Sequence, residues 1–125
     1  MINGIAIALQ FIVALGLLNV WLLRFNQKTA YRGGNATSMK EEFATYGLPP
    51  AMLFVVGGLK ILGAFALIIG IWVDQLVVPA AAIIAVLMVG ALVMHLKVQD
   101  PAIKSLPAAS VLLLSVGIIG LHLMG

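Results

Sequence analysis

The chain has 125 residues, of which 63% are hydrophobic and 9% charged, and its formal net charge at pH 7 is +3. Soluble domains carry about 25% charged residues, so this chain could not cover its surface in water and is expected to be an integral membrane protein. Its scattered basic residues form no nucleic-acid-binding run. The absence of cysteine excludes disulfides, thiolate metal sites and thiol-based redox chemistry through this chain.

Apolar stretches separated by short polar connections predict four transmembrane helices in a single domain, residues 1–125. The predicted spans are residues 2–23, 50–73, 77–98 and 106–124. A short amphipathic helix is predicted at about 39–46, between the first two spans. The expected fold is therefore an all-α membrane protein, an up-down four-helix transmembrane bundle with one interfacial helix.

Two polar residues and one aromatic residue distinguish the first span. Gln10 lies at mid-depth and Asn19 near the second end. Each is expected to form a hydrogen bond between helices, worth about 0.6 kcal/mol in membranes. The alternative is that Gln10 faces Lys60 of the second span. Trp21 is expected to lie in the aromatic belt at the membrane surface.

The connection 24–49 contains the predicted amphipathic helix. Ser38 and Glu41 have the spacing of a capping box. Its apolar residues follow helical spacing on one face: Met39, Phe43 and Tyr46. The helix is expected to lie in the membrane interface with this face towards lipid. Alternatively, it forms a lid over the end of the bundle, with four candidate mouth or lid residues: Glu41, Glu42, Tyr46 and Asp100.

The second span carries one charge, Lys60. Lys60 lies close to the midpoint of 50–73, where a charged group costs at least about 2.5 kcal/mol and is a functional candidate by default. Gly57 and Ala64 share its helix face, so Lys60 is expected to point into the bundle. No carboxylate lies within any span, so Lys60 is expected to have no acidic partner there.

Ser115 in the fourth span lies at a depth similar to that of Lys60. His95 lies three residues before the end of the third span. It is expected either to lie at the membrane interface or to line a mouth of the bundle shared with Glu41, Glu42 or Asp100. His122 falls at the opposite end, which disfavours a two-histidine metal site, and no metal or catalytic residue is predicted. The candidate ligand-binding residues are Lys60, Gln10, Ser115, Asn19 and His95.

The basic residues indicate the orientation. Six of the seven lie in the connections 24–49 and 97–105: Arg24, Lys28, Arg32, Lys40, Lys97 and Lys104. The positive-inside rule therefore places both connections in the cytoplasm and both termini outside, in a multi-pass protein of the cell membrane.

Four segments carry a family resemblance: residues 42–49 (EFATYGLP), 56–64 (VGGLKILGA), 90–101 (GALVMHLKVQDP) and Leu106-Pro107. In order and spacing they resemble the DoxX-like family of small four-span membrane proteins, over nearly the whole chain. The resemblance implies a link to a membrane subunit of thiosulfate:quinone oxidoreduction. Many DoxX relatives have a glutamate near the position of Lys60, so lysine here reverses the charge and argues against a carboxylate-based mechanism.

Three functional hypotheses follow. The leading one is a non-catalytic membrane partner or assembly subunit, for which a redox enzyme at the quinone pool is one expected partner. The second is a lipid- or quinone-binding oxidoreductase subunit with Lys60 in the pocket. The third is a small-molecule transporter, although Gln10 stands where small multidrug-resistance transporters have a membrane glutamate. The isolated chain is not expected to be an enzyme, quinone is the one ligand considered as a cofactor, and a homo-oligomer stays open.

Overall fold

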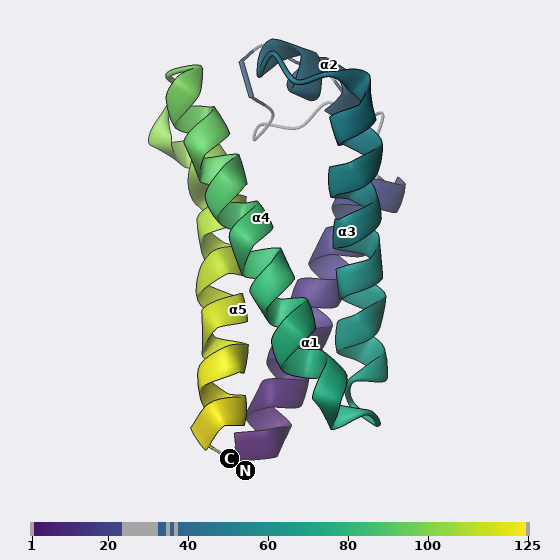
Figure 1. Ribbon diagram of the computed structural model, residues 1–125. Coiled ribbons are helices and arrows are strands. Elements are labelled where there is room, and N and C mark those ends of the chain that lie inside the picture. Colours follow the sequence, from purple (N-terminus) through teal and green to yellow (C-terminus); the bar gives the residue numbers. More distant parts are fainter. Residues whose placement is uncertain (1, 24–32, 35, 37, 125) are drawn as a thin grey trace.

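The computed structural model describes residues 2–23, 33–34, 36 and 38–124, and every regular element among them is a helix (Figure 1). Arg24, Lys28 and Arg32 lie outside the described residues. The elements are α1 (Ile2–Leu18), the π-helix η1 (Asn19–Leu23), α2 (Met39–Thr45), α3 (Pro50–Ile69), the short 3-10 helix η2 (Asp74–Leu76), α4 (Val77–Lys97), the 3-10 helix η3 (Ala102–Ser105) and α5 (Leu106–Met124).

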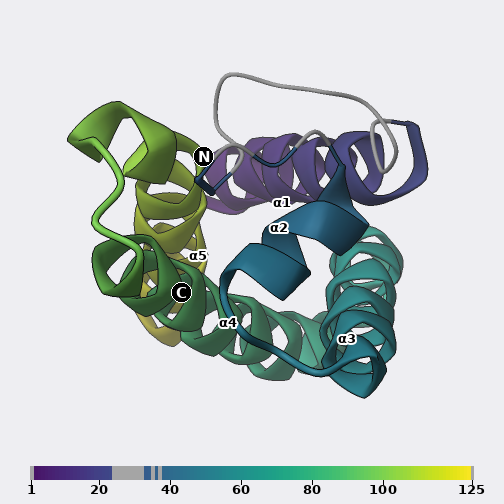
Figure 2. The same ribbon diagram turned by 90° about the horizontal axis from the view of Figure 1, so that it is seen from above.

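Four helical segments are long and apolar enough to cross a membrane: Gly4–Leu22, Ala51–Ile69, Asp74–Lys97 and Ala102–Met124. Successive spans run in opposite directions (Figure 1). The helices α1 and α4 each pack between α3 and α5, so the four spans form a ring. The short helix α2 lies across one end of this ring (Figure 2). The predicted all-α transmembrane bundle with a helix between its first two spans is confirmed.

The main core lies inside the ring, where apolar side chains of all four spans meet. Leu67, Ile84 and Ile118 are among its fully buried members. One polar contact crosses this core: the Gln10 side chain donates a hydrogen bond from Nε2 to the Leu67 carbonyl oxygen, at 2.8 Å. Gln10 therefore has the predicted interhelical role, because in a region without water the amide must find its partner within the protein.

A second cluster fixes α2 to the bundle. Ser38 caps α2 by accepting a hydrogen bond from the Glu41 backbone N–H at 3.2 Å, as the capping-box spacing predicts. The apolar face of α2 packs on the protein and not on lipid, since Met39 and Phe43 are buried against Trp21 and other apolar side chains of the cluster. The expected lipid-facing orientation of α2 is thus wrong.

Trp21 is also not the interfacial residue that its position predicted, because it is only 5% exposed. It belongs to the π-helix that ends the first span, and a π-turn changes the direction of the side chains that follow it. Its ring lies against Gly57 of α3.

The second span is shorter than predicted, since α3 ends at Ile69 and not at Val73. Gly70 explains the early end. A Cβ atom at this position would lie 2.5 Å from Cγ2 of Val77, so the absence of a side chain lets α3 and α4 approach closely at their hairpin. The ends of α4 and α5 lie within one residue of their predicted bounds.

Two neighbouring glycines of α3 test this packing. A Cβ atom at Gly57 would lie 2.5 Å from Cζ3 of Trp21, whereas one at Gly58 would meet no atom within 4 Å. We expect Gly57→Ala to destabilise the fold by about 1–3 kcal/mol through overpacking, and Gly58→Ala to leave stability unchanged or raise it. Thermal unfolding in detergent, followed by tryptophan fluorescence, measures both variants. Equal unfolding temperatures would contradict the predicted contact.

Candidate functional site

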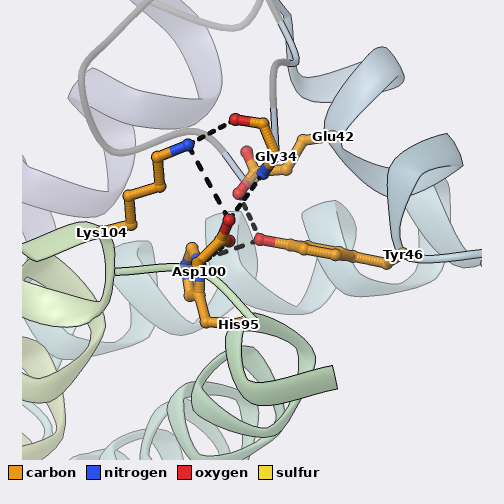
Figure 3. A network of polar contacts seen from close by, with 6 residues as sticks. All are labelled: Gly34, Glu42, Tyr46, His95, Asp100 and Lys104. Carbon is orange, nitrogen blue, oxygen red and sulfur yellow. Dashed lines mark hydrogen bonds and ion pairs between the residues drawn. The ribbon is translucent and has the colours of Figure 1, made fainter. Parts of the chain in front are cut away.

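Polar side chains gather at the end of the bundle that α2 covers, and His95 and Asp100 are their centre (Figure 3). His95 lies in the last turn of α4, and the chain then turns back through Gln99, whose φ of 57° is in the left-handed region. The turn brings Oδ2 of Asp100 to 2.7 Å from Nδ1 of His95. Both side chains are buried, at 6% and 4% exposure. A left-handed non-glycine residue is unfavourable by about 1–2 kcal/mol, so this turn depends on the contacts that it makes.

The second oxygen of Asp100 binds a distant part of the chain. Oδ1 accepts a hydrogen bond from the Gly34 backbone N–H at 2.9 Å and lies 3.8 Å from Nζ of Lys104. Lys104 in turn donates a hydrogen bond to the Gly34 carbonyl oxygen. The carboxylate thus links the connection before α2 to the α4–α5 connection (Figure 3).

These contacts shift the pKa of Asp100. Burial acts to raise it, but the hydrogen bonds from His95 and Gly34, with the charges of Lys104 and His95, outweigh burial and hold the pKa of the carboxyl below its usual value. Asp100 is therefore ionised throughout the physiological pH range.

Tyr46 continues the network from His95 to α2. Its hydroxyl donates a hydrogen bond to Oε1 of Glu42 at 2.7 Å, and Nε2 of His95 lies 3.5 Å from the Tyr46 hydroxyl oxygen. The tyrosine and histidine rings meet edge to face at 5.8 Å between centroids. Lys97 holds Tyr46 in place by donating to its carbonyl oxygen at 2.8 Å.

The direction of these hydrogen bonds limits where protons can be. Tyr46 has a single hydroxyl proton, and when Glu42 accepts it, the Tyr46 oxygen can only accept from Nε2 of His95. Because Nδ1 faces the Asp100 carboxylate, all of these contacts are satisfied together when both ring nitrogens of His95 carry a proton. The network thus connects α4 to α2 through the Tyr46 hydroxyl.

Lys60 lies at the inner side of this network. Its ammonium nitrogen is 5.2 Å from the centroid of the Trp21 ring, a cation–π contact. Trp21 meets Phe43 of α2 edge to face at 6.0 Å. Glu42 is close enough for its charge to act on Lys60. Lys60 points into the protein as predicted, and no carboxylate of a span lies beside it; the carboxylate whose charge acts on it, Glu42, comes from α2.

The other candidate residues lie elsewhere. The amide of Gln10 binds Leu67, about 10 Å along α3 from Lys60 at helical rise. Ser115 is fully buried in α5, and its hydroxyl has no hydrogen-bond partner among the described residues. Asn19 is half-buried in η1. Glu41 is exposed in the first turn of α2, next to the Ser38 cap.

The structure thus brings together four of the residues expected around the mouth, namely His95, Glu42, Tyr46 and Asp100. It adds Gly34, Lys104 and Trp21, which sequence reasoning missed. The position of Lys104, four residues after Asp100, was the one available signal, since an i,i+4 pair shares a helical face. Nothing in the sequence indicates that Gly34 reaches Asp100.

The fold and this buried network define a small four-span integral membrane protein whose polar end is closed by a short helix. The DoxX-like family model matches residues 28–118, and the chain belongs to the DoxX-like family. The match includes the network residues from Gly34 to Lys104, while Trp21 lies before it. No curated protein and no solved structure matches the chain.

Replacement of Asp100 tests the network. Because the folded-state pKa is lowered, the ionised carboxylate stabilises the fold above the unfolded-state value of about 3.9 and loses this effect as the pH falls through the folded-state value. We expect Asp100→Asn to lower stability at pH 7 by about 1.5–3 kcal/mol, the range for hydrogen bonds to a charged group.

Thermal unfolding in detergent measures this effect, and the difference between wild type and Asp100→Asn should shrink as the pH is lowered from 5 towards 3. Glu41→Gln is the matched control, since Glu41 is an exposed carboxylate at the same end. A wild-type protein no more stable than Asp100→Asn at pH 7 would contradict the assigned role.

Proposed function

We propose that this DoxX-like chain is the membrane subunit of a redox system and that it binds a quinone headgroup at the end covered by α2. The observation that carries the proposal is the continuous series of exchangeable groups from the surface into the bundle. It begins at Lys104 and Asp100, passes through His95 and Tyr46, and reaches Glu42 beside Lys60 (Figure 3).

Quinones match this series chemically. They dissolve in the bilayer, their carbonyl oxygens accept hydrogen bonds, and reduction to quinol consumes two electrons and two protons. Lys60 can donate hydrogen bonds to such oxygens, as can the Tyr46 hydroxyl if it releases Glu42, and the apolar cluster of Trp21 and Phe43 offers aromatic rings for the headgroup. The electrons come from a partner redox protein, so the proposal keeps the role of the chain as a subunit.

We also propose that the α2-covered end faces the cytoplasm. The described basic residues of the connections, Lys40, Lys97 and Lys104, all belong to segments at this end. The η2 turn at the other end contains Asp74 and no basic residue. A cytoplasmic network would take up protons from the side on which soluble dehydrogenases work.

Fluorescence of Trp21 tests quinone binding. Trp72 is 77% exposed, so Trp72→Phe leaves the buried Trp21 as the one tryptophan, next to Lys60. In lipid nanodiscs, a soluble quinone analogue should quench Trp21 saturably, and Lys60→Met or Tyr46→Phe should weaken the binding by roughly tenfold, equivalent to about 1.4 kcal/mol.

Two controls accompany this titration. Lys40→Met removes an exposed lysine of α2 and should leave the affinity unchanged. In the Trp21→Phe protein, Trp72 should report only quinone dissolved in lipid, with quenching that rises without saturation. Quenching of Trp21 that is equally unsaturable, or equal affinities in the wild type and Lys60→Met, would contradict the proposal.

Single cysteines test the orientation, since the natural chain has none. A membrane-impermeant maleimide should label Gln75→Cys in intact cells, because Gln75 lies in the exposed turn η2. Lys40→Cys should be labelled only after the membrane is permeabilised. The reverse pattern would place α2 outside.

A further inference from the structure

A second polar site lies at the opposite end of the bundle. A cavity of about 130 Å³ is enclosed there by α1, the turn after α3, η2 and α5. Its polar lining consists of Gln10, Asp74 and His122, and Ala6, Ile7 and Ile71 are among its apolar lining. None of these residues belongs to the network under α2.

His122 makes two contacts, both with hydrogen-bond acceptors. Its Nδ1 lies 3.1 Å from the Ile118 carbonyl oxygen, and its Nε2 lies 3.2 Å from Oδ1 of Asp74. His122 thus lies between the Ile118 carbonyl oxygen and the Asp74 carboxylate. A ligand that donates hydrogen bonds could take the place of the His122 ring at this carboxylate. Asp74 is the titratable group that faces His122 among the described residues around the cavity.

Gln10 supplies a further acceptor at the inner wall. Its side chain is 1% exposed and donates from Nε2 to Leu67. No hydrogen bond to Oε1 occurs among the described residues, so this oxygen is available to a ligand. Asp74, whose side chain is 85% exposed, stands at the open side. A ligand that reaches both acceptors must be a hydrogen-bond donor, and the carboxylate favours one with a positive charge.

The apolar lining and the volume narrow the ligand class further. A cavity of about 150 Å³ holds benzene, so this one has room for about five non-hydrogen atoms. Ala6, Ile7 and Ile71 would cover an alkyl group of that size. We propose that this cavity binds a small primary alkylammonium ion, with Asp74 and Gln10 as its acceptors, in place of the contact between His122 and Asp74.

Histidine NMR tests this site directly. The chain has two histidines, and His95 at the other end of the bundle serves as the internal control. In nanodiscs containing histidine-labelled protein, propylammonium chloride should shift the His122 ring signals saturably and leave those of His95 in place.

Matched ligands and variants complete the experiment. Neither 1-propanol nor an equal concentration of sodium chloride should shift His122, and Asp74→Asn should abolish the propylammonium shift while Glu41→Gln leaves it intact. An equal shift with 1-propanol, no saturable shift with propylammonium, or an unchanged shift in Asp74→Asn would overturn the site.

Discussion

The end of the bundle under α2 depends on one buried carboxylate. An ionised group away from water must be paired and hydrogen-bonded within the protein, because removing one partner of such a pair typically destabilises by about 3–5 kcal/mol. Asp100 satisfies this requirement with three partners from separate segments: the His95 ring, the Gly34 backbone N–H and Lys104. At this end α3 spreads away from α4 (Figure 1), and α2 lies across the ring (Figure 2).

The packing of α3 determines what surrounds Lys60. Residues without a side chain occupy the points where its neighbours come closest, with Trp21 against Gly57 and Val77 close to Gly70. Lys60 lies three residues after Gly57 and therefore on the same side of α3. The Trp21 ring that packs against Gly57 is for this reason also in contact with the Lys60 ammonium group. The same close approach thus packs the helix and provides a favourable contact for a charge in the bundle.

Each end of the bundle contains a histidine–aspartate pair, and the two pairs differ in how far they are buried. The His95–Asp100 pair is almost fully buried and leads through Tyr46 to Glu42. In the His122–Asp74 pair the carboxylate is exposed and the histidine borders a cavity. A buried pair favours a fixed network, whereas an open carboxylate can exchange its partner. This difference is why we propose quinone binding at the first end and binding of a small cation at the second.

The sequence by itself determined the membrane class, the four spans and the α2 helix with its Ser38 cap. Hydrophobic length and local hydrogen bonding fix these features, and both can be read from neighbouring residues. The choice of Leu67 as the partner of Gln10 was left to the tertiary structure. The early end of α3 was missed because Gly70 is needed for contact with Val77, which lies on another helix. Only the tertiary structure turned α2 towards the protein, since its apolar face could equally have met lipid. The tertiary structure also decided which residues lie near Asp100 and Lys60. Gly34, Glu42 and Trp21 are far from them in the sequence, so no local pattern predicts that they come close.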